Sequence, residues 1–431
     1  MPEFVGEIRD PLYKYVNFTE PEKLLIDSPP VQRLRRIKQL AGAHLTYASG
    51  EHSRFPHVLG VMHLAGKLGK KLLDGNRIGK DDWQKLRIAA LLHDVGHGPF
   101  SHTYEEVLYK YRKATHEDVS RWLILNTELK DIVSRSGFSP DEICELLVGS
   151  AASGKSKLLN QAISGHFDVD MMDYLVRDSH HTGVEYGYVD VERLIDSIVV
   201  VGETLAMNVN AMVALESFFI ARYMMFKAVY FHRTVRAAEI MVCKAMDLAN
   251  EALGLTDFKE PEEFLRLDDQ SVVSGIMSLE GGGKLKYAKE MVGMYNERRL
   301  LKAVFETFLH HEHKLYPTLL GRFDIRERLA EEMAEMAGVD PEYVIIDVPT
   351  VPSLPYRPLH GKSETEIQVA VERSPNSYEM RSIFDLSPVV SSLKGFLDVA
   401  RVYTVAEHRN KIQAAARSVF GEPPAAHRVS Y

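Results

Sequence analysis

The sequence has few cysteines and no long apolar run. Cys144 and Cys243 are the only two cysteines among 431 residues, and both lie in apolar patterns with helical spacing. We therefore expect reduced core side chains rather than a disulfide or a thiolate site. No segment approaches the roughly 18 consecutive apolar residues of a membrane span, and residues 1–10 lack the pattern of a secretion signal. These absences predict a cytoplasmic protein without a membrane contact.

The sequence also lacks an excess of positive charge. Its 52 Lys and Arg residues against 60 Asp and Glu residues give a formal net charge of −8, which argues against a protein that coats nucleic acid. One local basic cluster, formed by Arg33, Arg35, Arg36 and Lys38, has the charge to hold a small polyanion. With 45% apolar and 26% charged residues, the composition is that of an ordinary globular protein with room for a core and a further lobe.

Helical patterns dominate residues 20–329, so the predicted fold class is mainly α. Helices that start near Pro29, Pro56 and Pro140 are expected to run to residues 40, 73 and 148. A small β-hairpin is predicted for residues 197–201 and 204–208, and helical spacing resumes from 211 to 250. We expect one helical core over residues 1–330.

The composition changes after Asp340, where a smaller α+β lobe is predicted. Strands are expected at residues 343–348, 366–371 and 402–405, and helices at 387–398 and 407–420. This lobe, residues 331–431, carries no chemical motif, so we expect it to form interfaces.

The most informative segment is Leu-Leu-His-Asp-Val-Gly-His-Gly-Pro-Phe-Ser-His at residues 91–102. The preceding residues 83–92 are helix formers that become apolar all round, which predicts a helix entering a core. His93 and Asp94 are then buried, and a buried carboxylate without a partner costs several kcal/mol. A divalent cation removes that cost while imidazole supplies a second ligand. The alternative, a core histidine beside a capping aspartate, suits one His-Asp pair better than three histidines and an aspartate within ten residues.

Two distant segments offer further ligands. His57, in Arg54-Phe-Pro-His57, falls in the first turn of a predicted helix. In residues 167–181, Asp170 lies at helical spacing from Asp173, which in turn pairs with Arg177 at i,i+4. Acidic residues are also ordinary at helix starts, so the second segment points to a metal only in combination with the first motif.

Together these segments resemble the HD-domain metal-dependent phosphohydrolases, whose motif order is His, His-Asp, Asp. The similarity runs from about Ile8 to Lys302 and is greater to the deoxynucleoside triphosphate (dNTP) triphosphohydrolases, the branch with the mammalian sterile-alpha-motif HD enzyme and bacterial dNTP triphosphohydrolases. It implies an HD-domain helical core with a small β-hairpin. It also implies a divalent metal (Fe, Mn, Zn or Mg) held by His57, His93, Asp94 and Asp170.

The resemblance further implies the reaction. In the family, water activated by the metal attacks the α-phosphorus and intact triphosphate separates from the nucleoside. His116, in Thr115-His116-Glu117, matches the family's catalytic histidine, which protonates the leaving 5′-oxygen, and Glu117 is able to orient it. His97 and His102 match histidines on the phosphate side. From the residues alone, His116 reads as a surface residue at a helix start.

Substrate contacts follow from the same resemblance. Gln39 and Leu40 match the pair that selects deoxyribose, and Asp178 shares the 3′-hydroxyl contact. The full set of substrate-binding positions is Gln39, Leu40, Arg54, Tyr174, Asp178, Arg222 and Tyr230. Met171 and Phe226 depart from the mammalian pattern, where a lysine and a histidine stand. Both departures remove polarity, which keeps open another HD-type nucleotidase or phosphodiesterase, or a nucleotide-sensing scaffold.

Family members are often regulated by a nucleotide at subunit contacts. Asp27, Gln32 and Arg35 resemble residues that read a guanine activator, and Arg298 and Lys302 resemble its phosphate ligands. Gly6 departs from the mammalian activator site, where a lysine stands, and Asp27 also fits an ordinary helix cap. The resemblance thus implies a guanine nucleotide activator and a homo-oligomer, either a dimer or a tetramer.

One segment matches a nucleotide-binding motif but is better explained by its structural context. Residues 149–156, Gly-Ser-Ala-Ala-Ser-Gly-Lys-Ser, match the P-loop string letter for letter. A P-loop follows a strand, whereas a capped helix is predicted at residues 139–148. We therefore interpret residues 149–156 as a loop of small residues.

Overall fold

The computed structural model describes residues 3–148, 154–308, 320, 322–349, 367–374, 377–393 and 399–422. The chain divides into two compact units. Unit 1 contains residues 1–225, 254–273 and 355–393, and unit 2 contains residues 226–253, 274–354 and 394–431. The chain therefore passes between the units several times, which differs from the single boundary at residue 330 that the sequence suggests.

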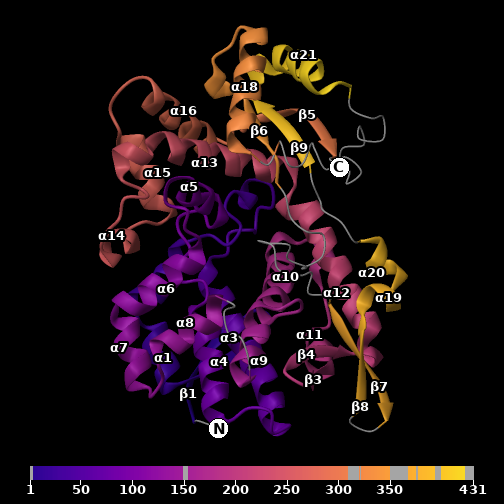
Figure 1. Cartoon of the computed structure of the whole chain (residues 1–431). Coiled ribbons are helices and arrows are strands. Elements are labelled where there is room, and N and C mark those ends of the chain that lie inside the picture. Colours follow the sequence, from indigo (N-terminus) through magenta and orange to yellow (C-terminus); the bar gives the residue numbers. More distant parts are fainter. Residues whose placement is uncertain are drawn as a thin grey trace. The chain divides into compact units, whose positions relative to one another are not determined.

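The centre of unit 1 is the helix pair α3 (Arg54–Asp74) and α4 (Lys80–Leu92), with α10 (Val169–Thr182) against α3 (Figure 1). Most side chains of α3 and α4 are buried, as the apolar run before His93 predicts. Further helices of this unit are α1 (Glu20–Ile26), α2 (Pro29–Arg33), α5 (His102–Arg112), α6 (His116–Asn126), α7 (Glu128–Arg135), α8 (Pro140–Val148), α9 (Gly154–Ser164), α11 (Val191–Ser197), α12 (Met212–Met225), α14 (Pro261–Leu265), α19 (Ile383–Leu386) and α20 (Pro388–Ser392). The prediction of a mainly α protein is confirmed.

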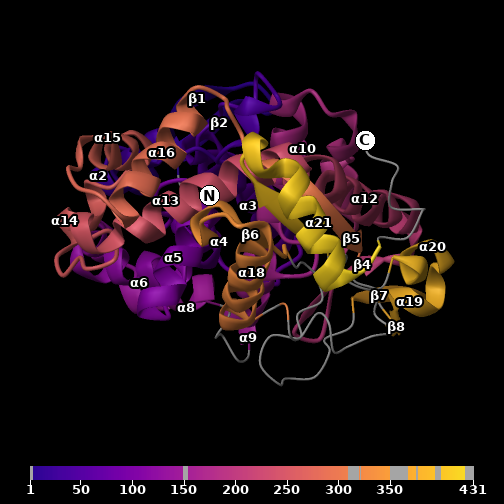
Figure 2. The same ribbon diagram turned by 90° about the horizontal axis from the view of Figure 1, so that it is seen from above.

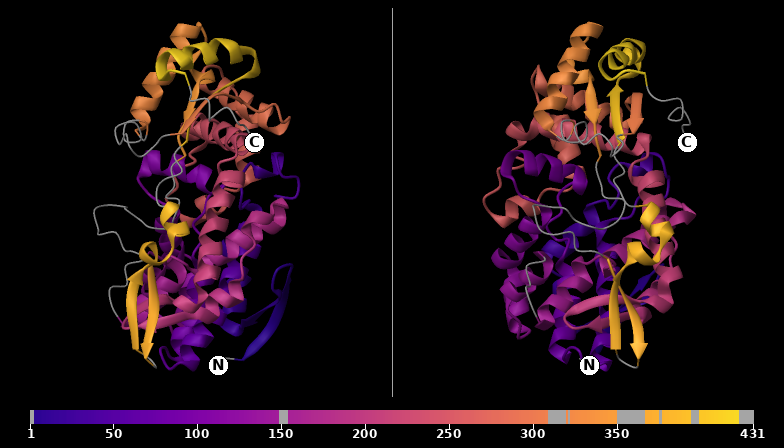
Figure 3. Two further views of the ribbon diagram at one scale, coloured as in Figure 1. Left: turned by 90° about the vertical axis from the view of Figure 1, so that its right-hand side faces the viewer. Right: turned by 45° about the vertical axis from the view of Figure 1, so that its right-hand side comes forward.

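Two small sheets belong to unit 1. Strands β1 (Phe4–Asp10) and β2 (Lys14–Thr19) form an antiparallel hairpin that the sequence analysis did not predict. The predicted hairpin is confirmed as β3 (Ile198–Val201) and β4 (Thr204–Asn208). It continues through β7 (Gln368–Ser374) into β8 (Ser377–Ser382), as Figure 3 shows, and β4 and β7 run parallel with Met207 opposite Val369.

Unit 2 has its own core. Helix α13 (Arg233–Leu253) packs against α16 (Lys284–Asn296). The antiparallel sheet β5 (Lys302–Phe308), β9 (Val399–Thr404) and β6 (Ile345–Asp347) packs with α18 (Phe323–Ala337) and α21 (Arg409–Phe420) (Figure 2). Buried residues of this core include Phe305, Met333, Ile346, Val402 and Ile412. Helix α15 (Asp269–Ser278) spans the point in the chain where unit 1 gives way to unit 2.

Two helical predictions were wrong in extent. Residues 302–308 form β5 rather than a helix, because the β-branched and aromatic residues here pair with β9. The helix expected to reach Leu40 ends at Arg33 and passes into a 3-10 turn at Leu34–Arg36. There the backbone N–H of Lys38 donates to Asp269 Oδ2 at 3.0 Å, so a tertiary contact replaces the next helical hydrogen bonds.

The long helix expected over residues 211–250 is also interrupted. It consists of α12, a π-helical turn at Phe226–Tyr230, and α13. One helical stretch, Val209–Tyr230, is long and apolar enough to cross a membrane: an 18-residue window within it has a mean hydropathy of 1.3, and 39% of that window is buried inside the protein. The whole stretch contains Glu216, Arg222 and Lys227. Core helices pass the same test, so this is weak evidence for a span.

Candidate metal centre and active site

Four side chains from three helices of unit 1 meet at one place. His57 lies in the first turn of α3, His93 and Asp94 follow the end of α4, and Asp170 lies in the first turn of α10. His57 Nε2 is 3.0 Å from Asp170 Oδ1 and 3.6 Å from Asp94 Oδ2. His93 Nε2 is 3.2 Å from Asp94 Oδ1 and 3.7 Å from Asp170 Oδ1. The structure therefore brings together all four residues that the sequence suggests as metal ligands.

The hydrogen bonds around this cluster fit a divalent cation. His93 Nδ1 lies 2.8 Å from the carbonyl oxygen of Ala90, whereas its buried Nε2 has no hydrogen-bond partner among the described residues. A histidine whose Nδ1–H is held in this way presents the Nε2 lone pair to a metal. The His57, His93 and Asp94 ligand atoms all lie within 4.8 Å of one another. An unused nitrogen beside two carboxylates is the donor set that a divalent metal requires.

The electrostatics of the cluster lead to the same conclusion. Burial lowers the pKa of His57, but hydrogen bonds to Asp170 and Asp173 raise it more, to about 10. The carboxylates therefore hold a positive charge here, as a proton or as a cation. Since ligand histidines must be neutral, a metal has to displace that proton.

Three further histidines form a second cluster beside the first. His97 follows Asp94 in the loop, and His102 and His116 are the first residues of α5 and α6. The His97 and His116 rings stack with centroids 3.9 Å apart, and the His97 and His102 centroids are 4.9 Å apart. His97 Nε2 lies 3.4 Å from Asp94 Oδ1. The predicted catalytic histidines thus adjoin the metal ligands.

The carboxylate that orients His116 is Glu105, which the sequence analysis missed. Its Oε1 accepts from the His116 backbone N–H at 2.9 Å and lies 2.7 Å from His116 Nδ1. Its Oε2 lies 3.0 Å from His102 Nδ1. The proposed orienting role of Glu117 stays a prediction. Glu105 stands three residues after His102 on one helix, a spacing that predicts the contact with His102 but not the contact with His116.

The pKa of His116 depends on Glu105. Burial lowers the pKa of His116, but the hydrogen bond to Glu105 and its charge raise it more, so the pKa lies above the ordinary value. Burial raises the pKa of Glu105, whereas the bonds from His102 and His116 lower it much more, so Glu105 is ionised. His116 therefore keeps its proton to a higher pH than a free histidine does.

We expect Glu105→Gln to shift the pH dependence of catalysis. His116 is the predicted proton donor, and a proton donor acts only below its pKa. Without the Glu105 charge the pKa of His116 falls, so the decline of kcat at alkaline pH should begin at lower pH in the variant. Because a general acid contributes about 10²–10⁴-fold, we expect kcat of the variant to fall at least roughly tenfold below that of the unmodified protein at the alkaline end of the profile. The measurement is a kcat profile from pH 6 to 9, with the exposed neighbour Glu106→Gln as control. Superimposable profiles for Glu105→Gln and the unmodified protein would contradict this role.

The loop between α4 and α5 is strained. Phe100 and Ser101 both have φ of 58°, which costs about 1–3 kcal/mol for a residue with a side chain. Hydrogen bonds hold this conformation: the Phe100 N–H donates to Asp269 Oδ1 at 2.7 Å, and Ser101 Oγ donates to the Lys38 carbonyl at 2.6 Å. Ser101 Oγ also accepts from Arg54 Nε at 2.7 Å. The strained loop is thus hydrogen-bonded to Arg54, which also pairs with Asp94.

The predicted substrate-binding residues of unit 1 fall into two groups, and Arg54 contacts the metal cluster. The Gln39 N–H donates to the His52 carbonyl at 3.0 Å, and His52 Nε2 lies 2.8 Å from Asp178 Oδ1. Gln39 and Asp178 are therefore linked through His52, and Leu40 follows Gln39 in the chain. Arg54 Nη1 forms a buried ion pair with Asp94 Oδ2.

The second group is Tyr174 with Arg222. Tyr174 lies one turn after Asp170 on α10 and is hydrogen-bonded to Arg222 of α12. Burial raises the pKa of Tyr174, so its hydroxyl remains protonated at neutral pH. Tyr230, the remaining predicted substrate residue, lies in the π-helical turn of unit 2 and contacts Phe226 with ring centroids 4.8 Å apart.

The residues suggested for an activator are divided between the units. In unit 1, Arg35 Nε donates to Gln32 Oε1 at 2.8 Å, and the Arg35 guanidinium lies 3.6 Å from the centre of the Phe55 ring. Asp27 is exposed and forms an ion pair with Lys23 at 3.1 Å. Arg298 and Lys302 are exposed residues of unit 2. The structure brings Gln32 and Arg35 into contact.

The P-loop string is not preceded by a strand. Helix α8 ends at Val148, residues 149–153 lie outside the described residues, and α9 begins at Gly154. Lys155 Nζ lies 3.5 Å from Asp82 Oδ2 on the surface of unit 1. Gly154, Lys155 and Ser156 begin α9, so the prediction of a loop was wrong for these three residues. The helix before the string stands where a P-loop requires a strand.

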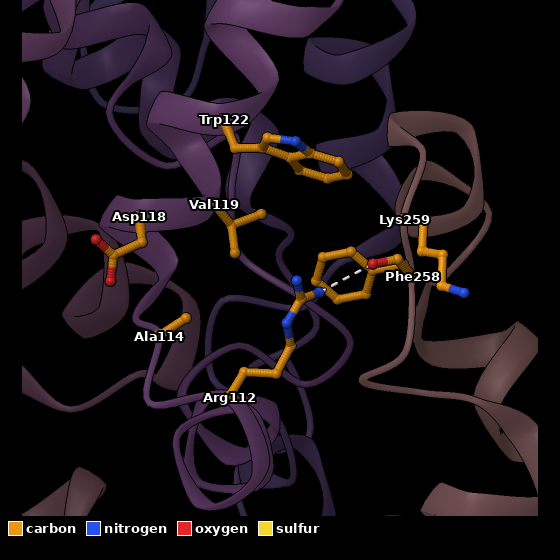
Figure 4. A pocket seen from close by; sticks show the side chains of 7 residues that line it. All are labelled: Arg112, Ala114, Asp118, Val119, Trp122, Phe258 and Lys259. Atoms are coloured by element: carbon orange, nitrogen blue, oxygen red, sulfur yellow. Dashed lines mark hydrogen bonds between the residues drawn. The ribbon is translucent and has the colours of Figure 1, made fainter.

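A pocket of about 480 Å³ lies along α6, which begins at His116 (Figure 4). Its lining residues are Arg112, Ala114, Asp118, Val119, Trp122, Phe258 and Lys259. Arg112 stacks 4.4 Å from the centre of the Phe258 ring and donates to the Phe258 carbonyl at 3.0 Å. The pocket contains no residue predicted from the sequence as part of a site.

Comparison with protein families accounts for this arrangement. The model of the HD domain matches residues 54–177, the segment that contains all four clustered ligands, and the model of the HD associated region matches residues 189–430. This chain belongs to the HD-domain phosphohydrolase family. HD domains bind divalent metals, and the His57, His93 and Asp94 group can hold one.

Three relatives of this HD-domain protein are informative. It is 31% identical over 412 residues to an uncharacterized protein, YwfO, of Bacillus subtilis, covering 90% of this chain and 89% of that one. It is 28% identical over 388 residues to the human deoxynucleoside triphosphate triphosphohydrolase SAMHD1, covering 79% of this chain but only 60% of the human protein. A crystal structure of a hypothetical protein from Aquifex aeolicus matches with a TM-score of 0.75 and 30% identity, covering 95% of this chain and 99% of that one.

Proposed function

We propose that this HD-domain protein hydrolyses deoxynucleoside triphosphates to the deoxynucleoside and inorganic triphosphate. The observation that carries the proposal is the contact between two clusters, one of metal ligands and one of histidines, joined by Asp94 and His97 at 3.4 Å. A donor set for a cation next to an oriented histidine suits the cleavage of a phosphate ester bond. The similarity to the human triphosphohydrolase supports the choice of substrate.

Different residues of the chain have different roles in this reaction. His57, His93, Asp94 and Asp170 would hold a divalent cation, which would supply Lewis acidity and lower the pKa of water at the site. In the reaction a bond forms between the water oxygen and the α-phosphorus while an O–H bond of that water breaks and its proton passes to solvent, and the bond from phosphorus to the 5′-oxygen breaks. The 5′-oxygen leaves as an alkoxide unless it receives a proton. His116, kept protonated by Glu105, donates that proton.

Sugar selection is assigned to the group around His52. In our proposal Gln39 and Asp178 contact the 3′-hydroxyl, and the Leu40 side chain occupies the space that a 2′-hydroxyl needs. Asp178 is 2% exposed and bonded to His52 at 2.8 Å, so it is held in one orientation. A rigid site with buried polar groups discriminates better than a flexible one, because a mismatched ligand leaves those groups without partners.

The test resolves products rather than total phosphate release. Metal-loaded protein is incubated with Mn²⁺ or Mg²⁺ and one dNTP or NTP at a time, and nucleosides, nucleotides and phosphates are separated. We expect deoxynucleoside and triphosphate in equal amounts, no reaction after metal removal, and slower turnover of ribonucleotides. Orthophosphate, pyrophosphate or a linear nucleotide would instead indicate another HD-type nucleotidase or phosphodiesterase, an alternative that the apolar Met171 and Phe226 keep open. No turnover of any nucleotide would leave a nucleotide-sensing scaffold.

The proposal extends to activation by a guanine nucleotide in a homo-oligomer. Gln32 and Arg35 are in contact and near the surface, and Arg35 stacks on Phe55, which fixes the guanidinium in a plane suited to a guanine edge. Asp27 of unit 1 and Arg298 and Lys302 of unit 2 stay predicted contacts of the activator. Adding GTP or dGTP to the assay, with oligomer size measured in parallel, tests this extension. Identical turnover and size with and without the nucleotide would contradict it.

A further inference from the structure

We propose that the turn of the N-terminal hairpin positions the metal ligand His57, with Tyr13 acting through Asp173. This inference rests on the metal site of the proposed function and assigns a role to a segment outside the residues matched by the HD-domain model, which begin at residue 54. Tyr13 touches neither substrate nor metal ligand, so it is a positioning residue. Its contacts form one continuous path to His57.

The path begins at the metal ligand. His57 Nδ1 lies 2.8 Å from Asp173 Oδ2, and both side chains are almost completely buried. A carboxylate at Nδ1 fixes the proton on that nitrogen and directs the Nε2 lone pair to the metal. His57 Nε2 is the atom that faces Asp94 and Asp170. The orientation of Asp173 therefore decides where the ligand nitrogen lies.

Asp173 is itself held by two neighbours. Arg177 donates from Nε to Oδ2 at 2.7 Å and from Nη2 to Oδ1 at 2.9 Å. The Tyr13 hydroxyl donates to Oδ1 at 2.8 Å. Each carboxylate oxygen thus has two partners. Without the tyrosine hydroxyl, Arg177 remains the one partner of Oδ1 among the described residues, and Asp173 gains freedom to rotate toward the guanidinium and away from His57.

The hairpin turn is anchored to the same network. Arg177 Nη1 donates to Asp10 Oδ2 at 3.0 Å. Asp10 Oδ1 accepts from the backbone N–H groups of Leu12 and Tyr13 at 2.9 and 3.1 Å. The Tyr13 ring stacks on His63 of α3 with centroids 4.9 Å apart. The tyrosine is therefore fixed at its backbone, its ring and its hydroxyl.

Gly60 on α3 leaves the space that this path occupies. A Cβ atom at this position would lie 1.9 Å from Asp173 Oδ1 and 2.4 Å from Arg177 Nη2. Both atoms belong to a fully buried ion pair joined by two hydrogen bonds, so moving either of them costs free energy. Gly60, one turn after His57, is thus required for the contact between Asp173 and Arg177.

The experiment compares Tyr13→Phe with Tyr15→Phe. Tyr15 is 43% exposed on the same hairpin and bonds only to Arg9 among the described residues through its hydroxyl, so it matches the chemical change without the path to His57. Mn²⁺ affinity is measured on metal-free protein by competition with a chelator, with no substrate present. We expect Tyr13→Phe to bind Mn²⁺ about 10- to 100-fold more weakly, the effect typical of lost outer-shell partners, and Tyr15→Phe to bind it normally.

The melting temperature of each metal-free variant separates positioning from folding. We expect similar, small decreases for both variants, with weak Mn²⁺ binding only in Tyr13→Phe. Unchanged Mn²⁺ affinity in Tyr13→Phe would overturn the inference, whatever its melting temperature. Asp94→Asn in the same binding assay distinguishes the two proposals. Normal Mn²⁺ binding by Asp94→Asn would contradict the metal site itself. If the unmodified protein does not hydrolyse dNTPs but Tyr13→Phe binds Mn²⁺ more weakly, only the proposed substrate is wrong.

Discussion

Asp94→Asn is expected to lower nucleotide hydrolysis by about 10³-fold or more and to release the metal. The Asp94 carboxylate lies within 3.6 Å of the nitrogens of His57, His93 and His97 and forms an ion pair with Arg54. Asparagine keeps the shape but removes the negative charge that attracts a cation. Lewis acid chemistry is worth several kcal/mol, and each 1.36 kcal/mol is a factor of about ten in rate.

The variant should also lose stability, because the Arg54 guanidinium is only 3% exposed and would remain buried without its counter-charge. Removing one partner of a buried ion pair costs about 3–5 kcal/mol. Metal content by elemental analysis, turnover at saturating metal and thermal unfolding test the three effects. Asp81→Asn, an exposed position in the first turn of α4, is the matched control. Normal metal content in Asp94→Asn would rule out its role as a ligand.

Gly96→Ala is expected to reduce hydrolysis about 10²-fold by displacing the helix that carries His116. A Cβ atom at Gly96 would lie 2.2 Å from both the His116 carbonyl oxygen and the Ser120 backbone nitrogen of α6. These are backbone atoms, so α6 must shift as a whole. A displacement of about 1 Å at a catalytic group costs roughly 10²-fold in rate, and overpacking costs about 1–3 kcal/mol in stability.

The loss should fall on kcat, with metal binding retained. The Gly96 N–H donates to Ser120 Oγ at 2.9 Å, and Ser120 Oγ donates to the His93 carbonyl at 2.9 Å, so the contact joins the metal motif to α6. Gly75→Ala, at the end of α3, is the control because its Cβ would come no closer than 3.4 Å to a neighbour. If Gly96→Ala kept full turnover, the close approach of α6 would have no catalytic role.

Part of the metal site was predictable because the local sequence around His93 and Asp94 requires both side chains to be buried. A histidine and an aspartate at the end of an apolar helix have to be buried, and burial demands a compensating charge. The glycines and proline after Asp94 end that helix, so His97 returns to the cluster. Asp173 and Arg177 pair as their spacing predicts. Local periodicity and the cost of burying charge were sufficient for His93 and Asp94, and the resemblance to the HD-domain family added His57 and Asp170.

Other features depended on contacts between distant segments. Glu105 acts on His116 from 11 residues away across the turn between α5 and α6, and Asp269 holds the Phe100 loop from 169 residues away. Strand β5 has a sequence that fits a helix or a strand, and pairing with β9, about a hundred residues later, decides for the strand. No local pattern contains these partners.

The sequence by itself determined the helical class, the hairpin at β3 and β4, and the buried pair His93 and Asp94, because each follows from periodicity or from the cost of burying a charge, whereas the complete set of four ligands followed from the resemblance to the HD-domain family. Only the tertiary structure decided which carboxylate orients His116, how the N-terminal turn reaches His57 through Asp173, and how the chain is divided into two units. Hydrogen bonds and close packing act over a few ångströms, so their partners are selected by the fold and not by distance along the chain.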